Sequence, residues 1–292
     1  WESKGHEKLT IMNNDKQWSS ANPGLLVILL DQSGSMMSNY EGNDSKTVFA
    51  SKAVNKVIDN IIQKNFAGEA PKNRCFIAVI GYNHEVKELC SGWLTDLDNN
   101  PLRIENVKVK QPDGNGGIIE IEIEQPIWVE PITKDGATNM KGAFELAKEL
   151  VSKWMADHNS EKDPAPVIIN ISDGVPYYNG KDVRICMQET KEVAQSIMAL
   201  SNNDGNVLIF NARIEKDGGR KVFPSSESEM TSEEERFIYD STSVIPEAYK
   251  AAARKVGLEV KDGSKGCIFE ADGVQLIQLI NFGSSMGQGD IK

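Results

Sequence analysis

One apolar run, followed at once by a short loop of acidic and hydroxyl-bearing residues, constrains this chain more than any other feature. The run from Leu25 to Leu30 is too short to span a bilayer, and its length and branched side chains are typical of a strand buried on both faces. The loop that follows, Asp31-Gln32-Ser33-Gly34-Ser35, offers one carboxylate and two hydroxyls at alternate positions. Because glycine permits a sharp bend, these oxygens can converge on one point. Hard oxygens at the carboxyl end of a buried strand predict a site for a small divalent cation.

Strand-length apolar runs alternate with amphipathic segments of helical period along most of the chain. Strands are expected at 25–30, 75–82, 86–90, 167–171, 207–210 and 267–269, and helices at 46–66, 139–154, 187–201, 246–256 and 274–280. This order requires mostly parallel strands joined by right-handed crossovers. The predicted fold class is therefore α/β, with a doubly wound, mostly parallel sheet and helices on both faces. Ligands of such sheets lie at the carboxyl ends of the strands, where both Asp31 and Asp173 fall.

Residues 101–131 break this rhythm with two alternating segments around a glycine-rich turn. The pattern predicts a β-hairpin with one solvated face, inserted between elements of the parallel sheet. Across the hairpin, acidic residues are expected to face basic ones, namely Glu120, Glu122 and Glu124 opposite Lys108 and Lys110. We interpret this face as an ordinary solvated surface rather than a binding patch.

The chain reads as a single domain, because its 292 residues contain no internal repeat and no long linker. We assign residues 23–283 to that domain, residues 1–22 to a polar, poorly ordered lead-in, and residues 284–292 to a flexible tail. Because Trp1 is no initiator methionine and Met12 could serve as one, residues 1–11 are either added sequence or the end of a longer chain.

The net charge of −11 argues against nucleic acid or an anionic membrane as a partner, because phosphate binding needs clustered Lys and Arg. The four cysteines show no CxxC pairing and no His at the spacing of a zinc site, which fits a reducing compartment. The sequence opens with no signal peptide and contains no long apolar stretch. Together these features predict a cytoplasmic location.

Three loops in a fixed order carry a resemblance to a known family. They are Asp31-x-Ser33-x-Ser35, Gly136-Ala137-Thr138 before a helix, and Ser172-Asp173-Gly174 after a strand. With these loops, the chain resembles the von Willebrand factor A (VWA) domain over residues from about 24 to 283. In that family the three corresponding loops form a metal-ion-dependent adhesion site. The resemblance implies that the Ser33 and Ser35 hydroxyls ligate the metal directly. It also implies that Asp31 and Asp173 act directly or through water, and that Thr138 coordinates in the ligand-engaged state.

The chemistry of these five side chains agrees with that implication. Mg²⁺ prefers six oxygen ligands and keeps waters readily, and Mn²⁺ or Ca²⁺ would accept the same donors. Two carboxylates and three neutral hydroxyls leave the metal electrophilic and leave a coordination position for an outside ligand. We therefore expect the partner to be a protein that presents Asp or Glu to the metal.

Segments outside the metal loops resemble a bacterial, cytoplasmic subgroup of VWA proteins. They are Gly114-x-Gly116-Gly117, Pro126-Ile127-Trp128-Val129-Glu130-Pro131, Asp204-Gly205-Asn206-Val207-Leu208-Ile209-Phe210-Asn211 and Phe269-Glu270-Ala271-Asp272. Members of this subgroup are often encoded beside a protein kinase and a metal-dependent serine/threonine phosphatase. The likeness implies a role in phosphorylation-linked signalling, stress response or defence.

Two other classes of function remain as alternatives to a binding module. In the first, the chain is a structural subunit whose metal only stabilises the loops. In the second, the chain is a metal-assisted hydrolase, which would need a general base near Asp173, and the sequence shows none. A Walker-type phosphate loop is absent, and the three histidines have neither metal-ligand spacing nor a GxSxG partner. We therefore predict that the chain is not an enzyme.

Overall fold

The computed structural model describes residues 13–112, 114, 116–216, 219–255 and 257–283. Its central sheet has seven strands in the order β12-β13-β11-β10-β1-β6-β7. Their bounds are β1 (Gly24–Asp31), β6 (Cys75–Tyr82), β7 (Val86–Trp93), β10 (Val167–Ser172), β11 (Leu208–Arg213), β12 (Lys221–Val222) and β13 (Cys267–Phe269). All neighbouring pairs are parallel except β6–β7 and β12–β13 at the two edges. The mostly parallel α/β class predicted from the sequence is confirmed.

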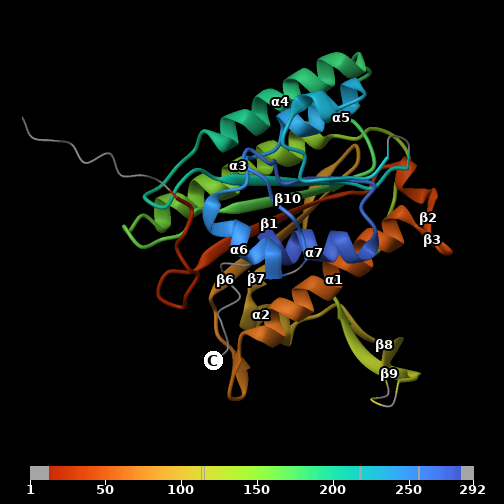
Figure 1. The fold of residues 1–292 in the computed structure, drawn as a ribbon, viewed down its shortest axis with the longest axis vertical. Helices are drawn as coiled ribbons and strands as arrows, with labels where there is room; N and C mark the ends of the chain where they lie inside the picture. The colour runs from red at the N-terminus through yellow and green to blue at the C-terminus, as the bar shows by residue number, and fades with distance from the viewer. Residues whose placement is uncertain (1–12, 113, 115, 217–218, 256, 284–292) are drawn as a thin grey trace, which may run out of the picture.

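Helices cover both faces of this sheet (Figure 1). One face packs against α1 (Lys46–Lys64), α2 (Leu94–Asn99), α6 (Glu247–Lys255) and α7 (Gly273–Gly283). The other packs against α3 (Met140–Asp157), α4 (Val183–Met198) and α5 (Glu233–Asp240). Short elements complete the chain: η1 (Gly34–Met37), β2 (Asn39–Glu41), β3 (Asp44–Ser45), β4 (Phe66–Ala67), β5 (Ala70–Pro71) and η2 (Glu227–Glu229). None of the described helices has the length and apolar character needed to cross a bilayer.

Strand β1 is the centre of both cores because its side chains alternate between the two faces. Leu26, Ile28 and Leu30 join the core beneath α1 and α7, whereas the intervening residues join the core beneath α3 and α4. From β1 the chain crosses through α1 to β6 on one side, and it later crosses through α3 to β10 on the other. The strand order therefore reverses between β1 and β10, which makes the carboxyl ends of these two strands the switch point of the sheet.

The predicted hairpin forms a separate ribbon of β8 (Arg103–Pro112) and β9 (Ile118–Ile127), which projects from the body (Figure 1). Its register places Lys108 opposite Glu122 and Lys110 opposite Glu120, as the alternation predicts, and Lys108 forms an ion pair with Glu120 at 3.4 Å. The base of the ribbon is attached to α1 through the buried side chain of Asn55. The Asn55 amide oxygen accepts the N–H groups of Trp128 and Val129 at 2.9 and 3.0 Å, and its Nδ2 donates to the Val129 carbonyl at 2.9 Å.

A buried chain of polar side chains crosses the sheet just below its carboxyl edge. The Tyr82 hydroxyl donates to Asn170 Oδ1 at 2.8 Å, and Asn170 Nδ2 donates to Asn211 Oδ1 at 2.9 Å. Asn211 Nδ2 in turn donates to the Thr242 hydroxyl at 2.8 Å. This ladder connects β6, β10, β11 and the segment after α5. It reaches over β1, because Tyr82 and Asn170 lie on the two strands that flank β1.

Several local predictions are wrong, and packing explains them. Residues 13–22, predicted as a poorly ordered lead-in, lie on the domain: Trp18 is buried, and Asp204 Oδ1 accepts the N–H groups of Asp15 and Lys16. Neither α2 nor the edge strand β12 was predicted, and β12 falls inside the stretch 217–232 assigned as loop. Helix α4 begins at Val183, four residues before the predicted start at 187. The predicted tail at 284–292 lies outside the described residues.

The four cysteines are free thiols, with Cys75, Cys186 and Cys267 buried and Cys90 half-buried. Burial raises the pKa of Cys75, Cys90 and Cys267 to about 12 in each case. Since the thiolate is the reactive form, we expect the folded protein to react only slowly with a thiol reagent at pH 8. The same assay in denaturant should count four thiols at once, and rapid labelling of the folded chain would contradict the burial.

Candidate metal centre

The first predicted ligand, Asp31, is the last residue of β1 and is fully buried. Its two carboxylate oxygens have different partners. Oδ1 accepts the backbone N–H of Ser33 at 2.9 Å, and Oδ2 accepts the hydroxyl of Ser172 at 2.8 Å. The carboxylate is therefore fixed between the loop after β1 and the end of β10, at the switch point of the sheet.

The loop that carries Thr138 lies directly against the loop after β1. Lys134 N–H donates to the Gln32 carbonyl at 3.0 Å. A Cβ at Gly34 would lie 2.5 Å from Asp135 Oδ1 and 3.3 Å from Asp135 Cα, so a larger residue there would force the exposed Asp135 side chain to move and the two loops to separate slightly. Thr138 is buried and exchanges backbone hydrogen bonds of 2.6 and 3.0 Å with Tyr177, in the loop after β10. These contacts bring all three predicted loops to one edge.

Four of the five predicted ligands form a continuous chain of contacts. The Ser33 and Ser35 hydroxyl oxygens are 3.1 Å apart, and the Ser35 hydroxyl donates to Asp173 Oδ1 at 2.9 Å. Together with the hydrogen bond from Ser33 N–H to Asp31, these contacts connect two carboxylates and two hydroxyls. Thr138 is held on the same edge through its backbone, and no hydrogen bond joins its hydroxyl to the other four. Ser35 is exposed, so the group is open to solvent on that side.

The electrostatics of the centre favour a cation beside Asp31. Burial, and secondarily the charge of Asp173, raise the pKa of Asp31 from 3.8 to about 6. Within the described part of the chain Asp31 forms no ion pair, so its charge is not compensated by a basic side chain. A cation bound among the four side chains would supply that compensation.

Lys46 and Glu215 belong to this centre, although we did not predict them. The Lys46 ammonium is 2.9 Å from Asp173 Oδ2 and also pairs with Glu215, which follows β11. Burial lowers the pKa of Lys46, but the hydrogen bonds to Glu215 and Asp173 outweigh this effect, so the pKa is raised and the group is charged. A signal was available: Lys46 is the first residue of α1, where the helix dipole disfavours a cation. Nothing in the pattern around Glu215 marks it.

The donor set fits a small, hard divalent cation better than a soft one, because it contains only carboxylate and hydroxyl oxygens. Among the described residues, no group of three or more His, Cys, Asp or Glu side chains is placed to hold a metal ion. The predicted set contains only two such residues, and its other members are hydroxyls. Ser33, Ser35, Asp31 and Asp173 are the side chains that would hold the cation, and Thr138 lies on the adjoining loop.

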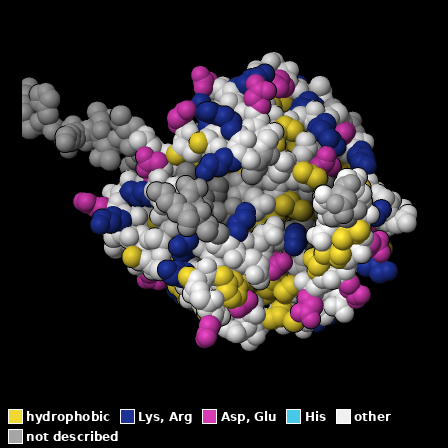
Figure 2. All heavy atoms as spheres, turned by 60° about the horizontal axis from the view of Figure 1, so that its bottom comes forward, with side chains coloured by type: hydrophobic (Ala, Val, Ile, Leu, Met, Phe, Trp, Pro, Cys, Tyr) yellow, Lys and Arg dark blue, Asp and Glu magenta, His cyan; other side chains and the backbone are white. Residues whose placement is uncertain are grey.

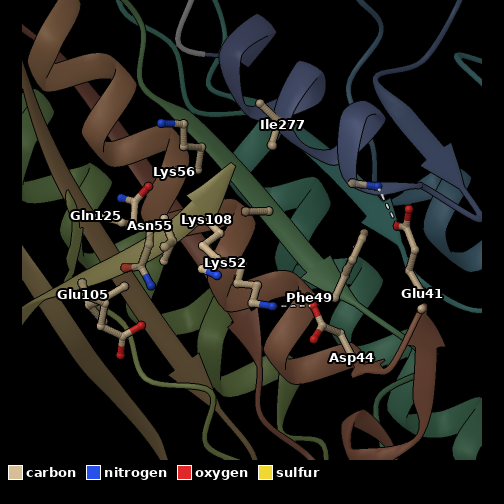
Figure 3. A pocket seen from close by; sticks show the side chains of 15 residues that line it. Glu41, Asp44, Phe49, Lys52, Asn55, Lys56, Glu105, Lys108, Gln125 and Ile277 are labelled. Atoms are coloured by element: carbon tan, nitrogen blue, oxygen red, sulfur yellow. Dashed lines mark hydrogen bonds and ion pairs between the residues drawn. The ribbon is translucent and has the colours of Figure 1, made fainter. Parts of the chain in front are cut away.

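A second concave surface lies beside the hairpin. It is a groove of about 720 Å³ between α1, the start of α7 and the β8–β9 ribbon. Figure 3 shows Lys52 pointing to Asp44 within this groove, and the two side chains form an ion pair at 2.7 Å. Acidic and basic side chains are interspersed with hydrophobic ones on the face that Figure 2 shows. The groove itself is lined by both acidic and basic side chains, among them Asp44, Glu105, Lys56 and Lys108, so it offers no single charge to a ligand.

No protein-family model matches the chain, and no curated protein sequence matches it. Solved structures do match. One is the ArnB paralog VWA2 from Sulfolobus acidocaldarius, with 16% identity, a TM-score of 0.34, and coverage of 67% of this chain and 36% of that one. Another is manganese-loaded TRAP protein from Plasmodium vivax, with 17% identity, a TM-score of 0.31, and coverage of 68% and 58%. A third is the PilB minor pilin from Streptococcus sanguinis, with 11% identity, a TM-score of 0.47, and coverage of 91% and 62%.

The chain spans less than two thirds of the length of each of these three proteins. At such identities and TM-scores, the likenesses carry no argument about function. The sheet topology of this chain defines its fold class, and the contacts at the carboxyl edge of the sheet are what bear on its function.

Proposed function

We propose that this chain is a divalent-metal-dependent protein-binding module of the VWA type, without catalysis of its own. Ser33 and Ser35 would ligate Mg²⁺, or Mn²⁺ or Ca²⁺, through their hydroxyls. Asp31 and Asp173 would act directly or through water, and Thr138 would complete the set when a partner engages. The bound cation would supply a Lewis-acidic position that takes a carboxylate oxygen from an Asp or Glu of the partner.

One observation carries this proposal: two carboxylates and two hydroxyls from the ends of β1 and β10 and the loops after them meet at the switch point of the sheet, and the buried Asp31 carboxylate forms no ion pair with any described residue. Contacts of 2.9 to 3.1 Å link Asp31, Ser33, Ser35 and Asp173. The exposure of Ser35 leaves an open approach for a partner. Tyr177 and Met37, on two of the same loops, are exposed hydrophobic side chains that could flank an acidic residue of the partner.

The same proposal extends to the cellular role. By resemblance to the bacterial subgroup, we place the module in the cytoplasm, in phosphorylation-linked signalling, stress response or defence beside a kinase and phosphatase pair. We propose protein as its ligand, and neither nucleic acid nor membrane. The net charge of −11 supports this choice, because a negatively charged chain is repelled by nucleic acid and by anionic membranes.

The test is a panning experiment with a display library of random peptides. Peptides retained in Mg²⁺ and released by EDTA should share an Asp or Glu, and changing that residue to Asn or Gln should abolish binding. Asp31→Ala should retain none of them. A pull-down from the source cell, with and without EDTA, would then identify the natural partner.

The control is Asp44→Ala, which removes a carboxylate that lies before α1 and forms an ion pair with exposed Lys52. It should bind as the wild type does. If Mg²⁺ stabilises the wild type but no acidic ligand depends on it, the metal is structural, as the alternative holds. Equal retention in every condition would reject the metal-dependent surface and direct mutagenesis to the groove beside the hairpin.

A further inference from the structure

The side chain of Lys46 places a permanent positive charge inside the candidate metal centre. It is only 4% exposed, and its ammonium donates to Asp173 Oδ2 at 2.9 Å while it also pairs with Glu215. The two oxygens of Asp173 are thus divided between a basic side chain and a neutral one. Oδ2 accepts from Lys46, and Oδ1 accepts from the Ser35 hydroxyl.

This position is an unfavourable one for a lysine. Burial of an ammonium is costly, and the first turn of a helix, where Lys46 lies, repels positive charge. Glu215 compensates only part of that cost, because its side chain is 34% exposed and the pair is correspondingly screened. A lysine elsewhere on the helix can form an ion pair at a smaller desolvation cost, as the exposed pair of Lys52 and Asp44 shows. The placement therefore points to a role in the centre itself.

We infer, on the basis of the proposed metal-binding function, that Lys46 is a positioning residue that holds Asp173 away from direct metal ligation and keeps the metal affinity low. With one oxygen of Asp173 bound to an ammonium, the carboxylate is partly neutralised before a cation arrives. The cation then receives less negative charge from the protein and keeps more attraction for a partner's carboxylate. Lys46 thereby lowers the affinity of the protein for the metal and strengthens the attraction of the bound metal for an acidic partner.

Two opposite effects follow when this charge is removed. Lys46→Met keeps the length of the side chain, removes the repulsion between two cations and frees Asp173 Oδ2. We expect it to tighten Mn²⁺ or Mg²⁺ binding roughly ten- to a hundredfold, because it deletes a unit charge close to the ion. Binding of an acidic peptide to the metal-loaded protein should weaken, since the metal is then better neutralised. A merely structural lysine would weaken both.

The experiment is a calorimetric titration of metal-stripped protein with MnCl₂, followed by a titration of the loaded protein with an Asp-containing peptide. Wild type, Lys46→Met, Lys52→Met and Asp31→Asn are compared. Lys52→Met is the matched control, because Lys52 lies on the same helix, is 67% exposed and pairs with Asp44 outside the centre. It should leave both affinities unchanged.

Glu215→Gln supplies a second, independent variant should Lys46→Met fail to fold. Removing this partly exposed acid leaves the charge of Lys46 less compensated, so metal affinity should fall several-fold. Metal binding that Asp31→Asn abolishes, but that Lys46→Met leaves unchanged or weakens, would overturn the inference and leave the metal site intact. An absence of metal binding in the wild type would overturn both.

Discussion

Asn55→Ala should destabilise the protein by about 3 kcal/mol or more, the largest loss that we expect from a single polar substitution. The side chain is buried and makes three hydrogen bonds to the backbone of Trp128 and Val129. Its removal leaves two N–H groups and one carbonyl without partners in a dry interior, at about 1–3 kcal/mol each before relaxation. Equilibrium unfolding in urea should show a lower midpoint.

Limited proteolysis within residues 103–127 should accelerate in the same variant, because Asn55 attaches the β8–β9 ribbon to α1. The control is Asn99→Ala, which removes a hydrogen bond between the exposed Asn99 side chain and the Thr95 carbonyl in helix α2. That change should stay within about 0.5 kcal/mol. An unchanged urea midpoint together with unchanged proteolysis would show that the attachment does not depend on Asn55.

Asp31→Asn should stabilise the metal-free protein and abolish its response to metal, a combination that an ordinary buried residue would not give. The raised pKa of about 6 means that the folded chain disfavours the Asp31 carboxylate at neutral pH. A neutral isostere should therefore raise stability in EDTA by about 1–3 kcal/mol. The asparagine oxygen can still accept the Ser33 N–H, and the displaced Ser172 hydroxyl retains the Gly174 carbonyl as an acceptor.

The pH dependence of the metal-free protein provides a second readout. Between pH 3.8 and about 6, Asp31 in the folded protein keeps a proton that it has released in the unfolded chain. The contribution of this residue to the free energy of unfolding is therefore complete below pH 3.8 and is lost as the pH rises through about 6. Asp31→Asn should lack this loss, and thermal unfolding in EDTA across that range measures it. Asp44→Asn serves as the control. A lower melting temperature for Asp31→Asn at pH 7, or a retained Mg²⁺ shift, would contradict the account.

The part of the fold that the sequence predicts well is the part with strong apolar periodicity. Strand β1 and the long helices α1 and α3 carry enough apolar residues at one spacing that tertiary packing does not overrule the pattern. The ligand loops are predictable for a related reason: Asp31 ends one buried strand and Asp173 directly follows another, so the sheet itself determines which edge they share.

The elements that were missed depend on contacts between distant residues. β12 is two residues long and exists because it pairs antiparallel with β13. The segment 13–22 is polar, but Asp204 accepts backbone N–H groups from it and Trp18 covers the glycine that begins β1. Lys46 and Glu215 lie 169 residues apart, so no local pattern could reveal that they meet at Asp173. A lysine at the first helical position is the one local signal among these.

The buried ladder of Tyr82, Asn170 and Asn211 determines how far apart the two acidic side chains of the candidate centre stand. A one-residue slip of β10 along β1 would move Asp173 by about 3.3 Å and turn its side chain to the opposite face. The same slip would bury Asn170 against apolar neighbours and break its hydrogen bonds to Tyr82 on β6 and to Asn211 on β11. The hydrogen bonds of Asn170 and Asn211 in the buried middle of the sheet therefore disfavour the neighbouring registers, and so they fix where the acidic side chains stand at its solvent-facing edge.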